Sequence, residues 1–182
     1  VADSSGHGNA LSAWSEGGGG GHVYRTDRPA GTIPLTGATN LYSVQNTGGG
    51  PCLFTQTGAP IQSITPATFT IEASFKPENG GYRTIVGRDS AGTVASDPAL
   101  SALYFQMIPG DAVAVKFCDV AGYWHDAISA AGLVKGFAWP NSNTGHWYHM
   151  AAVSDGQKLS LYLNDVDAGT GYTLVAQTDM TT

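Results

Sequence analysis

Few residues in this chain of 182 could perform hydrolytic chemistry. It contains three glutamates, Glu16, Glu72 and Glu78. Hydrolysis of a glycosidic bond normally needs two carboxyl groups that flank the bond, about 5–10 Å apart. Glu72 lies within a strong strand pattern, in which Thr70 and Ser74 would share its polar face. Glu72 is therefore the one candidate catalytic carboxylate, and the competing interpretation is a solvated strand residue.

A second group of residues combines aromatic rings with polar side chains. It falls between residues 119 and 144, where strand periodicity is weak and a long loop is expected. Sugars are bound by stacking on aromatic faces and by hydrogen bonds to amide, carboxylate and hydroxyl groups. An alternative is that Trp124 and Trp139 pack beneath this loop as a small satellite core. The predicted carbohydrate-binding residues are Tyr123, Trp124, His125, Asp126, Trp139, Asn141 and Asn143.

Residues 3–9 offer the hard oxygen ligands that calcium takes. Asp3 and Asn9 are the candidate metal ligands, and the alternative is a hydrogen-bonded turn without metal. The five histidines do not fall at paired zinc-ligand spacings. No organic cofactor is expected, because no Lys-Ser/Thr follows the pentaglycine run Gly17–Gly21, as a phosphate-binding loop requires.

Composition restricts the partners and the compartment. Charged residues make up 12% of the chain, the net charge is −6, and Lys and Arg are scattered singly. Nucleic acid and anionic membranes are therefore not expected as partners, and no apolar run approaches the roughly 18 residues of a membrane span. The few lysines and many Gly, Ser and Thr suit a secreted protein, in which Cys52 and Cys118 could form a disulfide. Two buried free thiols are the alternative, because sequence does not supply the geometry that decides the pairing.

The strands that must position these residues follow residue 60, apart from a short candidate at 42–44. Phe69–Phe75 alternates cleanly, with Phe69, Ile71, Ala73 and Phe75 inward. Short strands, frequent turns and the lack of helical periodicity predict an all-β protein, an antiparallel two-sheet β-sandwich in a single domain over 1–182. Further strands are expected at Thr84–Arg88, Ala102–Ile108, Ala112–Cys118 and Tyr172–Thr178, with the second and third joined by a turn at Pro109–Asp111.

A β-hairpin is the clearest element. Trp147–Val153 and Lys158–Leu163 are joined by a turn that contains Asp155-Gly156, where positive φ is tolerated. Side chains alternate between the two faces of a strand. We therefore expect the odd-numbered residues of 147–153 in the core, with His149 as a core histidine, facing the three leucines of 158–163.

Three stretches together resemble the laminin-G-like domains of the concanavalin A-like jelly-roll superfamily. They are the Asp-x-Ser-Gly-x-Gly-Asn turn at Asp3–Asn9, the strands within Phe69–Arg88, and the hairpin Trp147–Asp165. The resemblance implies a jelly-roll sandwich and, in some relatives, one structural calcium completed by an Asp near the C-terminal end. Such domains usually have a strand before the first stretch and a closing Gly-x-x-Asp-Glu-Val strand, neither of which is found in 1–182. We therefore hypothesise that a C-terminal remainder of the same product completes the sheet.

These observations predict a secreted, non-catalytic, lectin-like recognition module. Its expected partner is a carbohydrate or an extracellular glycoprotein, and it would belong to a larger extracellular carbohydrate-active protein. One alternative is a glycoside hydrolase or polysaccharide lyase on the same scaffold, with Glu72 as its carboxylate. Another is a protein-binding or adhesive module without a sugar site. One fold hosts many functions, so the fold alone does not choose among them.

Overall fold

The computed structural model describes residues 6–15, 21–29, 39–47, 51–55, 58–64, 66–78, 80–88, 102–119, 121–138 and 144–180. The chain divides into two compact units, Val1–Ile64 and Thr65–Thr182. The single domain expected over 1–182 stays a prediction. Four residues of the predicted sites, Asp3, Trp139, Asn141 and Asn143, lie outside the described residues.

The first unit contains two antiparallel strand pairs and a short 3-10 helix. The helix, η1 (Pro60–Ser63), begins with a proline, whose fixed φ suits a first turn. The short strand expected near residue 43 is present as β3, whereas the polar, glycine-rich pattern of this region did not predict the other three strands. The pairs are β1 (Leu11–Ser15) with β4 (Pro51–Thr55), and β2 (Gly21–Arg25) with β3 (Ser43–Thr47).

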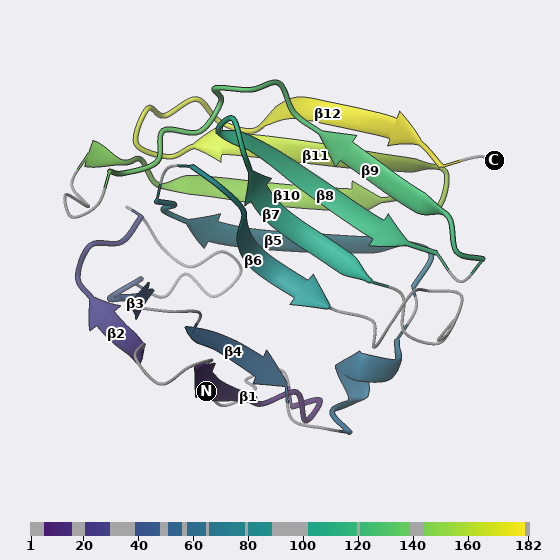
Figure 1. Cartoon of the computed structure of the whole chain (residues 1–182), viewed down its shortest axis with the longest axis horizontal. Helices are drawn as coiled ribbons and strands as arrows, with labels where there is room; N and C mark the ends of the chain where they lie inside the picture. Colours follow the sequence, from purple (N-terminus) through teal and green to yellow (C-terminus); the bar gives the residue numbers. More distant parts are fainter. Residues whose placement is uncertain are drawn as a thin grey trace. The chain divides into compact units, whose positions relative to one another are not determined.

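The second unit consists of two four-stranded antiparallel sheets that form a sandwich (Figure 1). Sheet I has the strand order β12-β11-β10-β5, and sheet II has the order β6-β7-β8-β9. This confirms the predicted all-β, two-sheet architecture. In the described part of the chain, no helix has the length and apolarity to cross a membrane. The strands are β5 (Phe69–Phe75), β6 (Arg83–Arg88), β7 (Leu103–Ile108), β8 (Ala112–Cys118), β9 (Trp124–Ile128), β10 (Tyr148–Ser154), β11 (Lys158–Asp165) and β12 (Thr173–Asp179).

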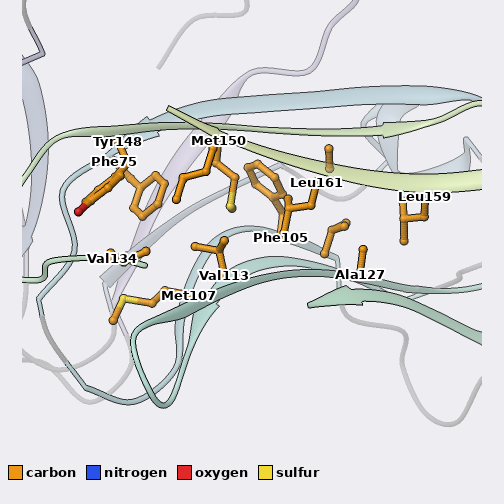
Figure 2. Close-up of a cluster of buried hydrophobic side chains, with 13 residues drawn as sticks. Phe75, Phe105, Met107, Val113, Ala127, Val134, Tyr148, Met150, Leu159 and Leu161 are labelled. Atoms are coloured by element: carbon orange, nitrogen blue, oxygen red, sulfur yellow. The ribbon is translucent and has the colours of Figure 1, made fainter. Parts of the chain in front are cut away.

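The hydrophobic core lies between sheets I and II (Figure 2). Sheet I contributes Met150 and the leucines of β11, and sheet II contributes Phe105 and Val113, all of them almost completely buried. The inward face predicted for β5 is confirmed, because Phe69, Ile71, Ala73 and Phe75 all pack in or against this cluster. Burial of apolar surface between the sheets is the main term that stabilises such a sandwich.

The face predicted for β10 is wrong. Its even-numbered residues Tyr148, Met150 and Ala152 are buried, whereas its odd-numbered residues are only partly buried. In the pairing with β11, Met150 lies opposite Leu163 and Ala152 opposite Leu161, and directly opposed residues share one face of a sheet. His149 therefore lies on the outer face and is not a core histidine. Both faces of this strand carry apolar or aromatic residues, so its own pattern does not decide which face is buried.

One strand, β9, was expected to be part of a loop. It pairs with β8, with Trp124 opposite Cys118 and Ile128 opposite Ala114. Of its five residues, Ala127 alone is buried. Its sequence therefore shows little of the apolar alternation by which strands are recognised. Trp124 consequently lies on a strand of sheet II, which holds its side chain more firmly than a loop would.

The core position of β11 makes a direct prediction about stability. Leu161 is completely buried, whereas Leu174 on the neighbouring strand β12 is 51% exposed. We expect Leu161→Ala to lower the free energy of unfolding by about 2–5 kcal/mol, because it removes buried methyl groups and leaves a cavity. The matched change Leu174→Ala should alter it by no more than about 0.5 kcal/mol. Urea unfolding of both variants measures the difference, and equal losses would contradict the assignment of the core.

Candidate functional site

Four side chains from three strands share one outer face of sheet II. Tyr104 on β7 lies opposite Lys116 on β8, and Lys116 lies opposite Asp126 on β9. Trp124 is two residues before Asp126 and therefore points to the same side. We call Tyr104, Lys116, Trp124 and Asp126 the Trp124 platform. The residues that alternate with them on these strands, such as Phe105, face the core.

The platform combines flat apolar surface with charged groups. The rings of Tyr104 and Trp124 are nearly parallel, at 12°, with centroids 6.2 Å apart, and Trp124 is 55% exposed. Lys116 Nζ lies 3.7 Å from Asp126 Oδ2. An ion pair exposed to this degree contributes less than about 1 kcal/mol, so both groups can exchange this contact for a ligand. The arrangement offers two aromatic faces, a donor and an acceptor.

Asp119 organises the turn that leads into β9. Its Oδ1 accepts hydrogen bonds from the backbone N–H groups of Ala121 and Tyr123, both at 2.9 Å, and its Oδ2 lies 3.0 Å from His125 Nε2. Burial alone would raise the pKa of Asp119, but the hydrogen bonds from His125, Tyr123 and Ala121 outweigh it and hold that pKa below its usual value. The His125 ring packs against Phe117, with centroids 5.1 Å apart. His125 therefore positions the turn beside the platform.

The predicted sugar-binding residues thus separate into groups. Trp124 and Asp126 belong to the platform, and Tyr123 is exposed in the adjacent turn. The side chain of His125 points to the opposite face of β9 from Trp124 and Asp126, and it interacts with Asp119. Trp139, Asn141 and Asn143 lie outside the described residues. The sequence reasoning missed Tyr104 and Lys116, although the turn predicted at Pro109–Asp111 already placed them on one face of the same hairpin.

Both cysteines are free thiols in the structure. Cys118 lies opposite Trp124 and has no exposed surface, whereas Cys52 is exposed. The two cysteines belong to different units, Val1–Ile64 and Thr65–Thr182, so the disulfide considered from the sequence stays a prediction. The alternative of two buried thiols does not fit Cys52, which is exposed. Burial, together with the charge of Asp119, raises the pKa of the Cys118 thiol, which therefore remains protonated at neutral pH.

Calcium binding through Asp3 and Asn9 stays a prediction. Asn9 Oδ1 accepts a hydrogen bond from the Ile61 backbone N–H at 2.9 Å, as a turn-forming asparagine does. Among the described residues, no three or more His, Cys, Asp or Glu side chains are grouped so that they could hold a metal ion.

Glu72, the candidate catalytic carboxylate, lies on the outer face of sheet I. His149 on the adjacent strand places its Nε2 3.5 Å from Glu72 Oε2, and its Nδ1 2.9 Å from Ser74 Oγ. In the register of β5 with β10, Glu72 lies opposite Ala151. The described positions on this face that adjoin Glu72 carry no second carboxylate, so they do not assemble the pair that glycoside hydrolysis needs.

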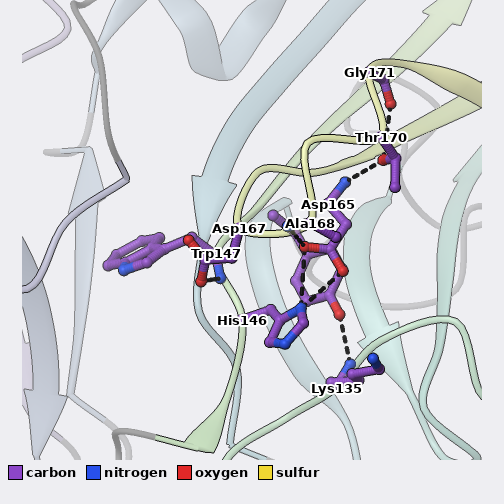
Figure 3. A network of polar contacts seen from close by, with 9 residues as sticks. Lys135, His146, Trp147, Asp165, Asp167, Ala168, Thr170 and Gly171 are labelled. Atoms are coloured by element: carbon purple, nitrogen blue, oxygen red, sulfur yellow. Dashed lines mark hydrogen bonds and ion pairs between the residues drawn. The ribbon is translucent and has the colours of Figure 1, made fainter.

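A polar network closes the loop that follows β11 (Figure 3). His146 Nδ1 lies 2.8 Å from Asp165 Oδ2, and Asp165 Oδ1 accepts a hydrogen bond from the Ala168 N–H at 3.0 Å. The Asp165 N–H donates to Thr170 Oγ1, also at 3.0 Å. Burial raises the pKa of Asp165, but the hydrogen bonds from His146 and Ala168 outweigh it and lower that pKa overall. Because each of these polar groups already has a hydrogen-bond partner inside the network, we interpret this network as structural.

Tyr148 belongs to the same network from the core side. Its Oη accepts a hydrogen bond from the Lys135 backbone N–H at 2.7 Å, and Asp167 Oδ2 accepts one from the Trp147 N–H at 2.9 Å. Burial, reinforced by the negative charge of Asp165, raises the pKa of Tyr148 to about 12. The phenol therefore stays neutral, and its hydrogen bonds tie β10 to the segment around Lys135.

Comparison with known proteins gives one match. A family model described as the concanavalin A-like lectin/glucanases superfamily matches residues 54–182. This range contains both sheets of the second unit and the whole Trp124 platform. No curated protein and no solved structure matches the chain.

The lowered pKa of Asp165 predicts how stability depends on pH. A carboxyl group with a depressed pKa in the folded state stabilises the fold above its unfolded pKa of about 3.9. That contribution is lost as the pH falls through the folded pKa. We therefore expect Asp165→Asn to unfold at lower urea concentration than the wild type at pH 7, with the gap narrowing as the pH is lowered below about 4.

Asp179→Asn is the control, because this exposed carboxylate makes only a 3.7 Å ion pair with Lys158. It should change the urea midpoint little at any pH. A gap for Asp165→Asn that stays constant from pH 7 into the acid range would contradict the role given to its charge.

Proposed function

This chain belongs to the concanavalin A-like lectin/glucanase superfamily, and on that premise we propose that it is a secreted, non-catalytic carbohydrate-binding module. We further propose that it serves a larger extracellular carbohydrate-active protein. The observation that carries the proposal is the Trp124 platform, an exposed aromatic surface beside a lysine and an aspartate. Secretion rests on composition, namely the low charge content and the abundant glycine.

The platform suits a sugar ring for physical reasons. A pyranose has an apolar face of C–H groups, which packs on an aromatic ring, and a rim of hydroxyl groups, which need hydrogen-bond partners. Trp124 and Tyr104 supply the ring faces. The Lys116 ammonium donates and the Asp126 carboxylate accepts, so one hydroxyl can satisfy both. Because the four residues stand on paired strands, binding orders no backbone here, and only the side chains lose rotamer freedom.

Binding is favoured over hydrolysis by the surroundings of Glu72. A hydrolase on this scaffold needs a second carboxyl group near Glu72, and the adjoining described positions on that face hold Thr70, Ser74, His149 and Ala151. A purely protein-binding module remains the other alternative, and a glycan array without hits would favour it. These observations support recognition of carbohydrate as the activity.

The proposal predicts the effect of removing the central ring. A glycan array identifies the ligands of the wild-type protein, and Trp124→Ala should weaken binding to those ligands by about tenfold or more, as loss of a central aromatic contact does. Tyr82→Ala is the matched control, because Tyr82 is also exposed, at 67% against 55% for Trp124, and directly precedes β6 at the edge of sheet II opposite β9. It should leave the affinity unchanged. An array without hits, or equal losses in both variants, would refute the platform as the binding site.

Catalysis is tested on the same ligands. Incubation of the wild-type protein with the polysaccharides that it binds should release no new reducing ends and no unsaturated products. Turnover that disappears in Glu72→Gln would show that the non-catalytic part of the proposal is wrong.

A further inference from the structure

The outer face of sheet I holds two buried polar atoms without a hydrogen-bond partner. They are His149 Nε2 on β10 and Asn164 Oδ1 on β11. These residues lie directly opposite each other in the β10–β11 pairing, so their side chains stand next to each other on one face. Most buried polar atoms in proteins are hydrogen-bonded, and each exception requires an explanation. Two exceptions at neighbouring positions could be satisfied together by one bound group, either a water molecule or a ligand hydroxyl.

The surroundings of His149 determine which kind of atom is unsatisfied. Ser74 Oγ lies 2.9 Å from Nδ1. Glu72 Oε2 lies 3.5 Å from Nε2, close enough to attract a proton there but without hydrogen-bond geometry. A neutral imidazole carries one proton, and the carboxylate favours it on Nε2. Nδ1 then accepts from the Ser74 hydroxyl, and the face presents one free donor at His149 beside one free acceptor at Asn164.

Tyr172 forms the wall of this arrangement. Its ring meets the His149 ring edge to face, with centroids 5.6 Å apart and planes at 83°, and Tyr172 is 55% exposed. Gly169 and Gly171 precede it with positive φ, so the loop backbone here adopts conformations that other residues disfavour. Burial and the charge of Glu72 raise the pKa of the Tyr172 hydroxyl, which stays neutral. Because both atoms are enclosed in the unliganded chain, a ligand reaches them only when the exposed Tyr172 ring, which packs on His149, turns aside.

From this geometry we propose a second sugar-binding site on the outer face of sheet I, formed by Glu72, His149, Asn164 and Tyr172. Its ligand is a vicinal diol of a pyranose. One hydroxyl accepts from His149 Nε2–H and donates to Asn164 Oδ1, and the neighbouring hydroxyl donates to the Glu72 carboxylate. The choice of a sugar rests on the proposed function, whereas the need for an outside donor and acceptor rests on the two unpartnered atoms.

The second site would make the module bivalent. Sheets I and II present their outer faces to opposite sides of the sandwich (Figure 1). A glycan held at the Trp124 platform therefore leaves the His149 face open to another glycan chain. The protein would then bridge two chains, and the gain in apparent affinity on a dense glycan surface would come from linkage rather than from new contacts.

Titration of the isotope-labelled protein with methyl pyranosides, followed by NMR, tests both faces in one experiment. The probes are the glucoside, galactoside and mannoside, with methyl 3-deoxy-glucopyranoside as the control that keeps two ring hydroxyls but no vicinal pair. We expect two separate sets of shifted signals, one around Trp124 and one around His149, Asn164 and Tyr172. The 3-deoxy compound should bind about tenfold more weakly at the His149 set, because a hydrogen bond to a charged group is lost.

Variants separate this proposal from the proposed function. Asn164→Leu should abolish the ligand-induced shifts around His149 and preserve those around Trp124. Trp124→Ala should abolish the shifts around Trp124 and preserve those around His149. Asn164→Leu should not lower stability, since it removes a buried acceptor that lacks a partner. Glu72→Gln, which keeps its shape on an exposed position, should also weaken the His149 set, while Glu78→Gln is the matched control.

Each outcome decides something. Shifts confined to the Trp124 set would overturn the second site and leave the proposed function intact. Shifts confined to the His149 set would support the second site and reject the Trp124 platform as a sugar-binding site. Shifts at neither face would reject both, and equal binding of the 3-deoxy compound at the His149 set would overturn recognition of a vicinal diol.

Discussion

The register in which β5 pairs with β10 determines which side chains of the second unit reach the core. These strands are about 75 residues apart in the chain, and their pairing sets Ala73 opposite Met150 on the inner face and Ser74 opposite His149 on the outer one. Since side chains alternate, a shift of one residue would exchange the two faces. Glu72 and His149 would then enter the apolar core, where a charged group is strongly unfavourable unless it is paired. The leucines of β11 enforce the observed register from the other edge of β10.

The same constraint produces two chemically different outer faces from one core. Sheet II buries Phe105, Val115 and Ala127, and so it must turn Tyr104, Lys116 and Asp126 outward. Sheet I buries the three leucines of β11 and places an acid, an imidazole and an amide on its outer face. Apart from Tyr172, which lies in the loop before β12, the residues of both candidate sites therefore stand on paired strands, and this fixes their backbone geometry before any ligand binds. The polar network around Asp165 fixes the loop that leads toward Tyr172.

How much of this could be predicted from the sequence depended on how different the two faces of each strand were. The strand Phe69–Phe75 was predicted with its bounds and its inward face, because large apolar residues alternate there with polar ones. Trp147–Val153 was recognised as a strand, but its buried face was misassigned, since only the partner strand distinguishes its faces. Trp124 was selected for its chemistry and yet placed in a loop, because β9 contributes a single small residue to the core.

Tyr104, Lys116 and Asn164 belong to the candidate sites because of cross-strand pairing, which no local sequence pattern reveals. The buried His149 and Asn164 atoms likewise become notable only when the structure shows that the described residues offer them no hydrogen-bond partner. Sequence thus indicated the kind of ligand through aromatic and polar residue types, whereas the register decided which of those residues stand together.

The central claim is that the aromatic face of sheet II holds a sugar ring. A crystal structure of the protein with the oligosaccharide that binds best in a glycan array tests it most directly. The account predicts a pyranose ring packed on Trp124, with its hydroxyl groups within hydrogen-bond distance of Lys116 Nζ and Asp126 Oδ2. An oligosaccharide bound elsewhere, with the Trp124 ring still open to solvent, would contradict it.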